Sequence, residues 1–142
     1  MGAPNRFDLD PAEGHCPLCA RIARGDAVAA SSDGLAVAVR DAYPVAEGHT
    51  LVIPRRHEPD LLGLSATETA SLWELVHEVA RRVLAETGAD GFNVGVNAGV
   101  AAGQTVMHVH VHIIPRRLGD VPDPRGGVRW VLHERAPYWE DE

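Results

Sequence analysis

The sequence predicts an α+β fold, and three observations support this class. Short stretches of alternating or continuous apolar residues, typical of strands, flank one long segment, 61–87, whose apolar residues recur at helical spacing. Asp33-Gly34 separates two of the strand-like stretches as a hairpin turn would, which makes those strands antiparallel. With 142 residues, 45% of them hydrophobic, the chain is long enough for one domain that buries about two-thirds of its unfolded surface.

The part of the chain before the long helix is predicted to hold a loose arm, a short helix and three strands. Residues 1–13 mix Pro, Asn, Asp and Gly without periodicity, which is typical of a loose N-terminal arm. Gly25 ends the short helix, because glycine readily adopts the conformation that closes a helix. The predicted elements are the helix 20–24 and the strands 28–31, 35–40 and 50–54.

The long segment is predicted to form a loop and the major helix of the fold. Ser65 and Glu68 have the spacing of a capping box, which marks the first turn of the helix. Apolar residues from Leu72 to Leu84 form one stripe, and Gly88 ends the helix. This helix is therefore expected to cover the apolar face of the sheet.

The C-terminal half is predicted to contribute two strands before its last region. The first covers 92–97, and the second is rich in histidine and ends at Pro115, because proline cannot donate a hydrogen bond to a neighbouring strand. Residues 119–142 are predicted to form a loop, one more strand over 128–133 and an acidic tail.

Three histidines of the second strand are the strongest functional signal. His108, His110 and His112 alternate with apolar residues, so in a strand their rings share one face and neighbouring Cα atoms lie about 6.6 Å apart. The pattern fits the polar face of a half-exposed strand, a metal site, or a nucleophilic imidazole with a supporting neighbour on each side. The glycine-rich run 99–105 favours a phosphate ligand, because glycine lets backbone N–H groups approach an anion.

The same residues resemble those of the histidine triad (HIT) family of nucleotide hydrolases and transferases. The signature is His-x-His-x-His followed by two hydrophobic residues, and this chain reads HVHVHII. Three further segments resemble family segments in family order: DAYPVAEGHTLVIPRRH, GADGFNVGVNAG and AAGQTVMHVHVHIIPRR. The resemblance covers most of residues 14–120. It implies a HIT-like fold over 14–118, with an antiparallel sheet of about five strands, one long and one short helix, and a homodimer.

The resemblance also implies a role for individual residues. His110 matches the nucleophile, whose second ring nitrogen is expected to donate to a backbone carbonyl, and His112 and His49 match residues that hold the phosphate. Gln104 and Thr105 would offer neutral hydrogen-bond donors to the phosphate oxygens. The positions that match ribose and phosphate contacts are Asp41, Asn97, Gly103, Gln104 and Thr105. Without the resemblance, Asp41 would be interpreted as a residue that forms a turn.

Cys16 and Cys19 are the two cysteines of the chain and form a C-x-x-C pair. A disulfide is not expected in a reducing compartment, and a thioredoxin-like site would need a βαβ context, so half of a zinc site is the better interpretation. Some bacterial HIT proteins place zinc on such a pair together with the residues that match His57 and His108. The resemblance thus implies a structural zinc on Cys16, Cys19, His57 and His108; free buried thiols are the alternative. No organic cofactor is expected.

Charge and hydropathy narrow the classes of partner. The formal net charge of −7 argues against binding to nucleic acid or to an anionic membrane, which would need a basic face. The uncharged run 91–107 contains Asn, Gln and several glycines and is no membrane span, and no signal peptide is recognised, so a cytoplasmic protein is expected.

The predicted function is a nucleotide hydrolase that cleaves at the α-phosphorus of an adenosine nucleotide through a nucleotidyl-histidine. The substrate would be a dinucleoside polyphosphate or a nucleoside phosphoramidate. His112 favours hydrolysis, since related nucleotidyl transferases carry Gln at this place. Two alternatives remain: a nucleotide-binding regulatory module with little catalysis, and a metal-dependent hydrolase in which His108 and His110 hold a zinc ion that activates water.

Overall fold

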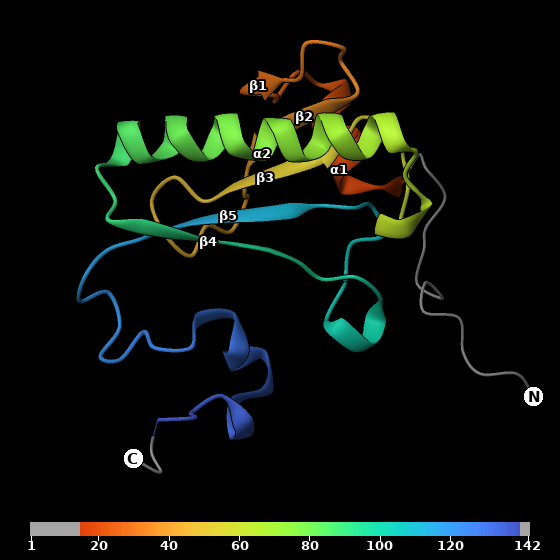
Figure 1. The fold of residues 1–142 in the computed structure, drawn as a ribbon. Coiled ribbons are helices and arrows are strands. Elements are labelled where there is room, and N and C mark those ends of the chain that lie inside the picture. Colours follow the sequence, from red (N-terminus) through yellow and green to blue (C-terminus); the bar gives the residue numbers. More distant parts are fainter. Residues whose placement is uncertain (1–14, 140–142) are drawn as a thin grey trace, which may run out of the picture.

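A five-stranded antiparallel sheet with the strand order β1-β2-β3-β5-β4 forms the centre of the protein. The structure is a computed structural model and describes residues 15–139; the N-terminal arm 1–13 and the end of the acidic tail lie outside the described residues. Figure 1 shows the long helix along the sheet and the C-terminal segment beside β4. The strands are β1 (Ala29–Ala30), β2 (Ala36–Arg40), β3 (Thr50–Pro54), β4 (Gly91–Val96) and β5 (Val111–Arg116). The α-helices are α1 (Pro17–Ala23) and α2 (Ala66–Thr87), and the 3₁₀ segments are η2 (Leu61–Gly63), η3 (Val100–Ala102) and η4 (Gly127–Arg135). The predicted α+β class and five-stranded sheet are confirmed.

Helix α2 covers one face of the sheet, as its apolar stripe predicts. Both hydrogen bonds of the capping box between Ser65 and Glu68 are present, and Gly88 closes the helix with φ 68°. The stripe packs against apolar side chains of β2, β3 and β5 to form the main core. The core consists of Ala36, Ala38, Val52, Leu72, Leu75, Val76, Val79, Ala80, Val83, Val109, Val111 and Ile113.

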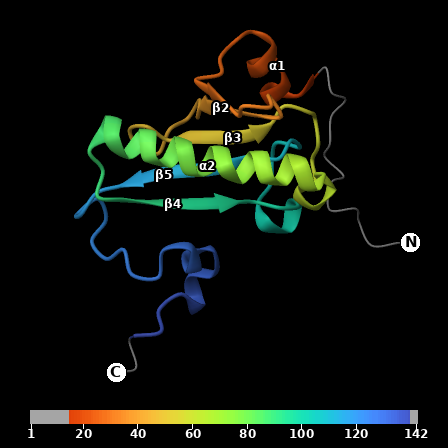
Figure 2. The same ribbon diagram turned by 45° about the horizontal axis from the view of Figure 1, so that its top comes forward.

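Helix α1 packs on the opposite face, over β2 and β3. It begins at Pro17, earlier than predicted, because proline suits the first helical position and the Cys16 Sγ accepts a hydrogen bond from the Cys19 N–H. Leu18 joins a second apolar cluster with β2 and β3 residues. Figure 2 shows α1 at the β2 side of the sheet, away from β4.

Two predictions for the C-terminal half are wrong in detail. β5 continues through Pro115 to Arg116. The Arg116 carbonyl accepts from the Asp90 N–H on the β4 side, so the backbone nitrogen of Pro115 points to the β3 side. The pairing of β5 with β3 ends at Ile113, so the missing N–H of Pro115 breaks no hydrogen bond between strands. The segment 128–133 is not a strand but part of η4. Its Trp130 indole donates to the Arg125 carbonyl at 2.7 Å, so local bonds replace strand pairing.

Over residues 15–139, no helix has the length and hydropathy needed to cross a membrane.

Candidate active site and metal-ligand cluster

The three histidines of the sequence motif serve two separate places. Only His112 lies in β5; His108 and His110 precede the strand. The His108 ring is fully buried beside the cysteines, whereas the His110 and His112 rings lie 5.1 Å apart between their centroids and line one cavity. The prediction that all three imidazoles face one way is therefore wrong, because the chain is not yet in a strand at His108.

His110 has the tautomer that a nucleophile needs. Its Nδ1 lies 2.8 Å from the carbonyl oxygen of His108. A carbonyl only accepts, so Nδ1 carries the proton and Nε2 keeps a lone pair. The expected hydrogen bond from His110 to a backbone carbonyl is confirmed.

A chain of hydrogen bonds gives His112 the opposite tautomer. The Val45 N–H donates to His49 Nδ1 at 3.2 Å, so a neutral His49 carries its proton on Nε2. That nitrogen lies 2.9 Å from His112 Nδ1 and donates to it. His112 consequently carries its proton on Nε2 and offers a donor, next to the lone pair that His110 offers.

Burial keeps the rings of His49 and His112 neutral at pH 7. The pKa of His49 is lowered by desolvation, against an opposing effect of the Asp41 carboxylate. The pKa of His112 is lowered by desolvation and by the neighbouring imidazoles of His110 and His49, and Asp41 opposes this shift too. Neutral rings have the single proton that the hydrogen-bond chain requires.

Acidification is expected to destabilise the fold through the same two imidazoles. Because their pKa values are lower in the fold than the ordinary 6.5, the unfolded chain binds more protons as the pH drops below about 6.5. Stability should then decrease from pH 7 to 5.5, and the effect should be absent above that range. Thermal unfolding of wild type and His112→Gln between pH 5.5 and 7.5 measures it, and the variant should show the shallower slope. If Tm changed equally with pH in the two proteins, the lowered pKa of His112 would be contradicted.

Asp41 has two roles in the geometry. Its Oδ1 accepts a hydrogen bond of 2.7 Å from the Tyr43 N–H, which is the turn role predicted from sequence alone. Its Oδ2 lies 3.4 Å from His49 Nε2. The carboxylate thus lies at the wall of the cavity that also contains His110.

Two cavities meet at His112. The first, of about 620 Å³, lies between α1 and the histidines, and its wall includes Leu18, Asn97, Gly103 and Thr105. The second, of about 670 Å³, lies between β4, β5 and the C-terminal segment. Asn97 and His112 line both cavities. A molecule with its reacting atom at the histidines could therefore extend into both.

Gln104 does not contact either cavity. Its side chain is buried: Oε1 accepts from the Gly99 N–H at 2.8 Å, and Nε2 donates to the carbonyls of Pro59 at 2.9 Å and Val106 at 3.2 Å. The prediction that this amide contacts the phosphate is wrong, because the carbonyls of Pro59 and Val106 take its amide donors and the Gly99 N–H takes its acceptor. Gln104 instead maintains the loop that carries Gly103 and Thr105.

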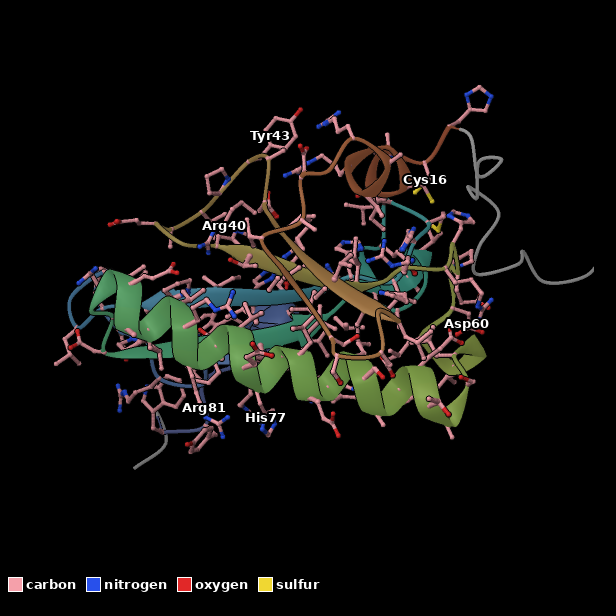
Figure 3. All side chains as sticks on the ribbon, turned by 90° about the horizontal axis from the view of Figure 1, so that it is seen from above. Cys16, Arg40, Tyr43, Asp60, His77 and Arg81 are labelled. Atoms are coloured by element: carbon pink, nitrogen blue, oxygen red, sulfur yellow. The ribbon has the colours of Figure 1, made fainter. Side chains whose placement is uncertain are left out.

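A Cys2His2 cluster, formed by Cys16, Cys19, His57 and His108, lies next to this site. One ligand atom of each residue lies within 4.8 Å of the others. The Cys16 Sγ is 3.5 Å from His108 Nδ1, and the Cys19 Sγ is 3.4 Å from His57 Nδ1. Figure 3 shows Cys16 on the α1 side of the molecule, with Tyr43 on the same side and His77 of α2 on the other. The predicted ligands are thus brought together.

The donor set of the cluster fits zinc. Two thiolates and two imidazoles are a common tetrahedral set for structural zinc. His108 Nε2 lies 2.8 Å from the carbonyl oxygen of Pro54, so it carries the proton and leaves Nδ1 as the ligand atom facing the cysteines. Such a hydrogen bond is the usual way in which a protein orients a metal-binding histidine.

Three contributions to the site were not found from the sequence. They are the Val45 N–H, the Glu58 carbonyl that accepts from the Val109 N–H at 2.8 Å, and the second cavity with Trp130 at its wall. The first two are backbone groups, which any residue could supply, so no side-chain pattern indicates them.

Comparison with known proteins agrees with the predicted family. A family model described as HIT domain matches residues 25–119. An HIT-like protein of Mycobacterium tuberculosis is 40% identical over 106 residues, which are 74% of each chain. An Arabidopsis thaliana protein named adenylylsulfatase HINT3 is 36% identical, over 74% of this chain and 54% of its own length. An asymmetrical bis(5'-nucleosyl)-tetraphosphatase of Schizosaccharomyces pombe is 43% identical, over 61% of this chain and 47% of its own length. The chain thus spans about half the length of these two named enzymes.

A solved structure extends this similarity to most of the described chain. The crystal structure of a Zn-bound histidine triad family protein from Mycobacterium smegmatis matches with a TM-score of 0.68 at 32% identity, over 86% of this chain and 94% of its own. The match of the family model, the similar structure and the positions of the histidines agree with one another. The chain belongs to the HIT domain family.

Proposed function

We propose that this protein hydrolyses an adenosine nucleotide at its α-phosphorus through a nucleotidyl intermediate on His110. One observation carries the proposal: a single cavity presents the Nε2 lone pair of His110 beside the Nε2 proton of His112, with the two ring centroids 5.1 Å apart. The hydrolase names of relatives support the class of reaction.

The reaction has two displacements. His110 Nε2 forms a bond to phosphorus, and the leaving group departs with the electron pair of the bond that breaks. Water then adds to phosphorus, and the electron pair of the P–N bond returns to Nε2. Over both steps the hydroxyl of water goes to phosphorus and its proton to the leaving group. His108 supports the intermediate, because its carbonyl oxygen, 2.8 Å from Nδ1, faces the imidazole when it becomes positively charged.

The first cavity suits the nucleotide. Leu18 and Leu51 offer apolar wall to a flat base, and the Asp41 carboxylate can accept hydrogen bonds from ribose hydroxyls. Gly103 and Thr105 lie at the loop side, where backbone and hydroxyl groups can reach a phosphate oxygen. His112 would hold the phosphate from the strand side, and His49 would support His112 through the hydrogen bond to its Nδ1 rather than contact the phosphate itself.

The second cavity suits the leaving group, and its charges favour a phosphoramidate over a polyphosphate. Among the described residues that line it, Arg116 is the one Arg or Lys. Its guanidinium already donates to Asp120 at 2.7 and 2.8 Å and to Asn93 at 2.7 Å. The wall also includes Ile114 and Trp130, which suit an organic amine better than a chain of phosphates.

Intact-protein mass after acid quench tests the function. Brief mixing with an adenosine phosphoramidate should give an AMP adduct on the wild-type protein, and turnover should exceed that with diadenosine tetraphosphate. Faster turnover of the tetraphosphate would contradict the proposed leaving group but keep the hydrolase. Nucleotide binding with neither adduct nor turnover would instead indicate a regulatory binding module.

The geometry does not favour the metal-dependent hydrolase. His108 Nδ1 faces the cysteines, whereas His110 lines the nucleotide cavity, so the two rings do not converge on one ion there.

We also propose a homodimer. β4 is an edge strand of the sheet, and Phe92 on this strand and Trp73 on α2 are 43% and 38% exposed. An apolar edge of this kind is commonly covered by a second chain.

A further inference from the structure

We propose that the Cys2His2 cluster controls the geometry of His110 through one peptide group, the group that joins His108 to Val109. His108 is then a positioning residue as well as a metal ligand. The inference rests on the proposed function only where turnover is measured; its structural part concerns the chain alone.

Both polar atoms of this peptide group are engaged. Its carbonyl oxygen accepts the hydrogen bond from His110 Nδ1 at 2.8 Å. Its N–H, which belongs to Val109, donates to the carbonyl oxygen of Glu58 at 2.8 Å. A rotation of the peptide plane would break both bonds, so its orientation decides where the acceptor for His110 lies.

Each side of the peptide group is attached to a ligand of the cluster. On one side is His108, which is fully buried, with Nδ1 3.5 Å from both cysteine sulfurs and Nε2 2.8 Å from the Pro54 carbonyl. On the other side Glu58 directly follows His57, whose Nδ1 lies 3.4 Å from the Cys19 Sγ. Binding of one ion by both histidines would therefore hold the peptide group from its two ends.

The consequence for His110 is a choice of tautomer. The His108 carbonyl selects the proton on Nδ1, because a carbonyl cannot donate. If the cluster relaxes and the carbonyl turns away, the tautomer with the proton on Nε2 becomes populated. That tautomer has no lone pair facing the phosphorus and cannot attack. Zinc binding by this chain should thus raise the fraction of competent His110 without touching the substrate.

Nitrogen NMR of histidine-labelled protein tests the proposal directly. Spectra at one fixed pH, without substrate, are compared for protein loaded with Zn²⁺, stripped with a chelator, and reloaded. We expect His110 to show the Nδ1–H tautomer alone when loaded and a second tautomer when stripped, with recovery on reloading. His77, exposed on the outer side of α2, is the internal control and should give the same signal in all three samples.

Steady-state kinetics supply the second measurement. Stripping should lower kcat roughly tenfold, as loss of a supporting contact commonly does, and change KM by less than about threefold. A change in KM alone would mean that zinc acts on substrate binding instead. The route would be the Pro59 carbonyl, which lies in the same loop as His57 and accepts a hydrogen bond from Gln104, and this result would overturn the proposal. If the loaded protein turns over no nucleotide at all, the proposed function fails while the NMR result still decides this inference.

If the protein unfolds when zinc is removed, a second comparison still tests the proposal. Zn²⁺-loaded wild type is then compared with Zn²⁺-loaded His57→Cys, which keeps four ligands but changes the attachment of the loop that carries Glu58. The proposal requires the His110 nitrogen signals to differ between the two proteins, while those of His77 stay the same. Identical His110 signals, or an unchanged tautomer in a folded stripped protein, would overturn it.

Discussion

Replacement of His110 by alanine is expected to lower kcat by roughly 10⁴-fold or more, because it removes the atom that is proposed to form the bond to phosphorus. The fold should remain, since the ring is only half-buried and its hydrogen bond to the His108 carbonyl stays within the same short segment. Turnover of an adenosine phosphoramidate, together with the mass of the acid-quenched protein, measures the effect. Steady-state turnover should fall to near the background rate, and the AMP adduct should be absent from the mass spectrum.

His77→Ala is the matched control for that experiment. This histidine is exposed on α2, on the side of the molecule away from Cys16, and lies outside both cavities of the candidate site. It should keep wild-type turnover and form the adduct. If His110→Ala kept more than about one hundredth of the wild-type rate, the nucleophile would have to be another group, and the covalent mechanism on His110 would be abandoned.

Replacement of Cys16 by serine is expected to cause the largest loss of stability among single changes at the site. Cys16 is 2% exposed and supplies one of the four donor atoms of the cluster. With free zinc about a thousandfold above its Kd, metal binding stabilises the folded state by about 4 kcal/mol. Loss of that binding should lower Tm by roughly 10 to 15 °C for a domain of this size. Thermal unfolding with and without added Zn²⁺ measures it.

Ala20→Ser supplies the control for the cysteine variant. It places the same side chain at an exposed position of α1 that supplies no donor atom to the cluster, and it should unfold close to wild type. Added Zn²⁺ should raise the Tm of wild type and of Ala20→Ser, and it should leave Cys16→Ser nearly unchanged. An equal response of Cys16→Ser to zinc would mean that Cys16 is not a ligand.

Local signals in the sequence predicted much of the fold correctly. Ser65, Glu68 and Gly88 mark the ends of α2 because capping depends on a few neighbouring side chains and on one backbone conformation. The C-x-x-C pair predicted one half of a metal cluster, and the resemblance to HIT proteins supplied the other half at His57 and His108. The structure brings the four ligand atoms within 4.8 Å of one another.

Sequence patterns were less reliable where contacts between distant segments decide the structure. The alternation of histidines predicted one shared face, but His108 turns to the cysteines of α1 before β5 begins. Gln104 was predicted to face a phosphate, yet its amide bonds to Pro59 and to its own loop. The apolar residues of 128–133 predicted a strand, but η4 bonds locally beside the sheet.

The sequence by itself determined the class of the fold through periodicity and short-range capping, and the family through the resemblance of its motifs. It also predicted most of the candidate residues of both sites. Only the tertiary structure decided which nitrogen of each histidine carries the proton. That choice depends on backbone groups at Val45, His108 and Pro54, which the fold brings to the imidazoles. Every residue has a backbone C=O and every non-proline residue an N–H, so no pattern of side chains could have indicated which of these groups the rings would meet.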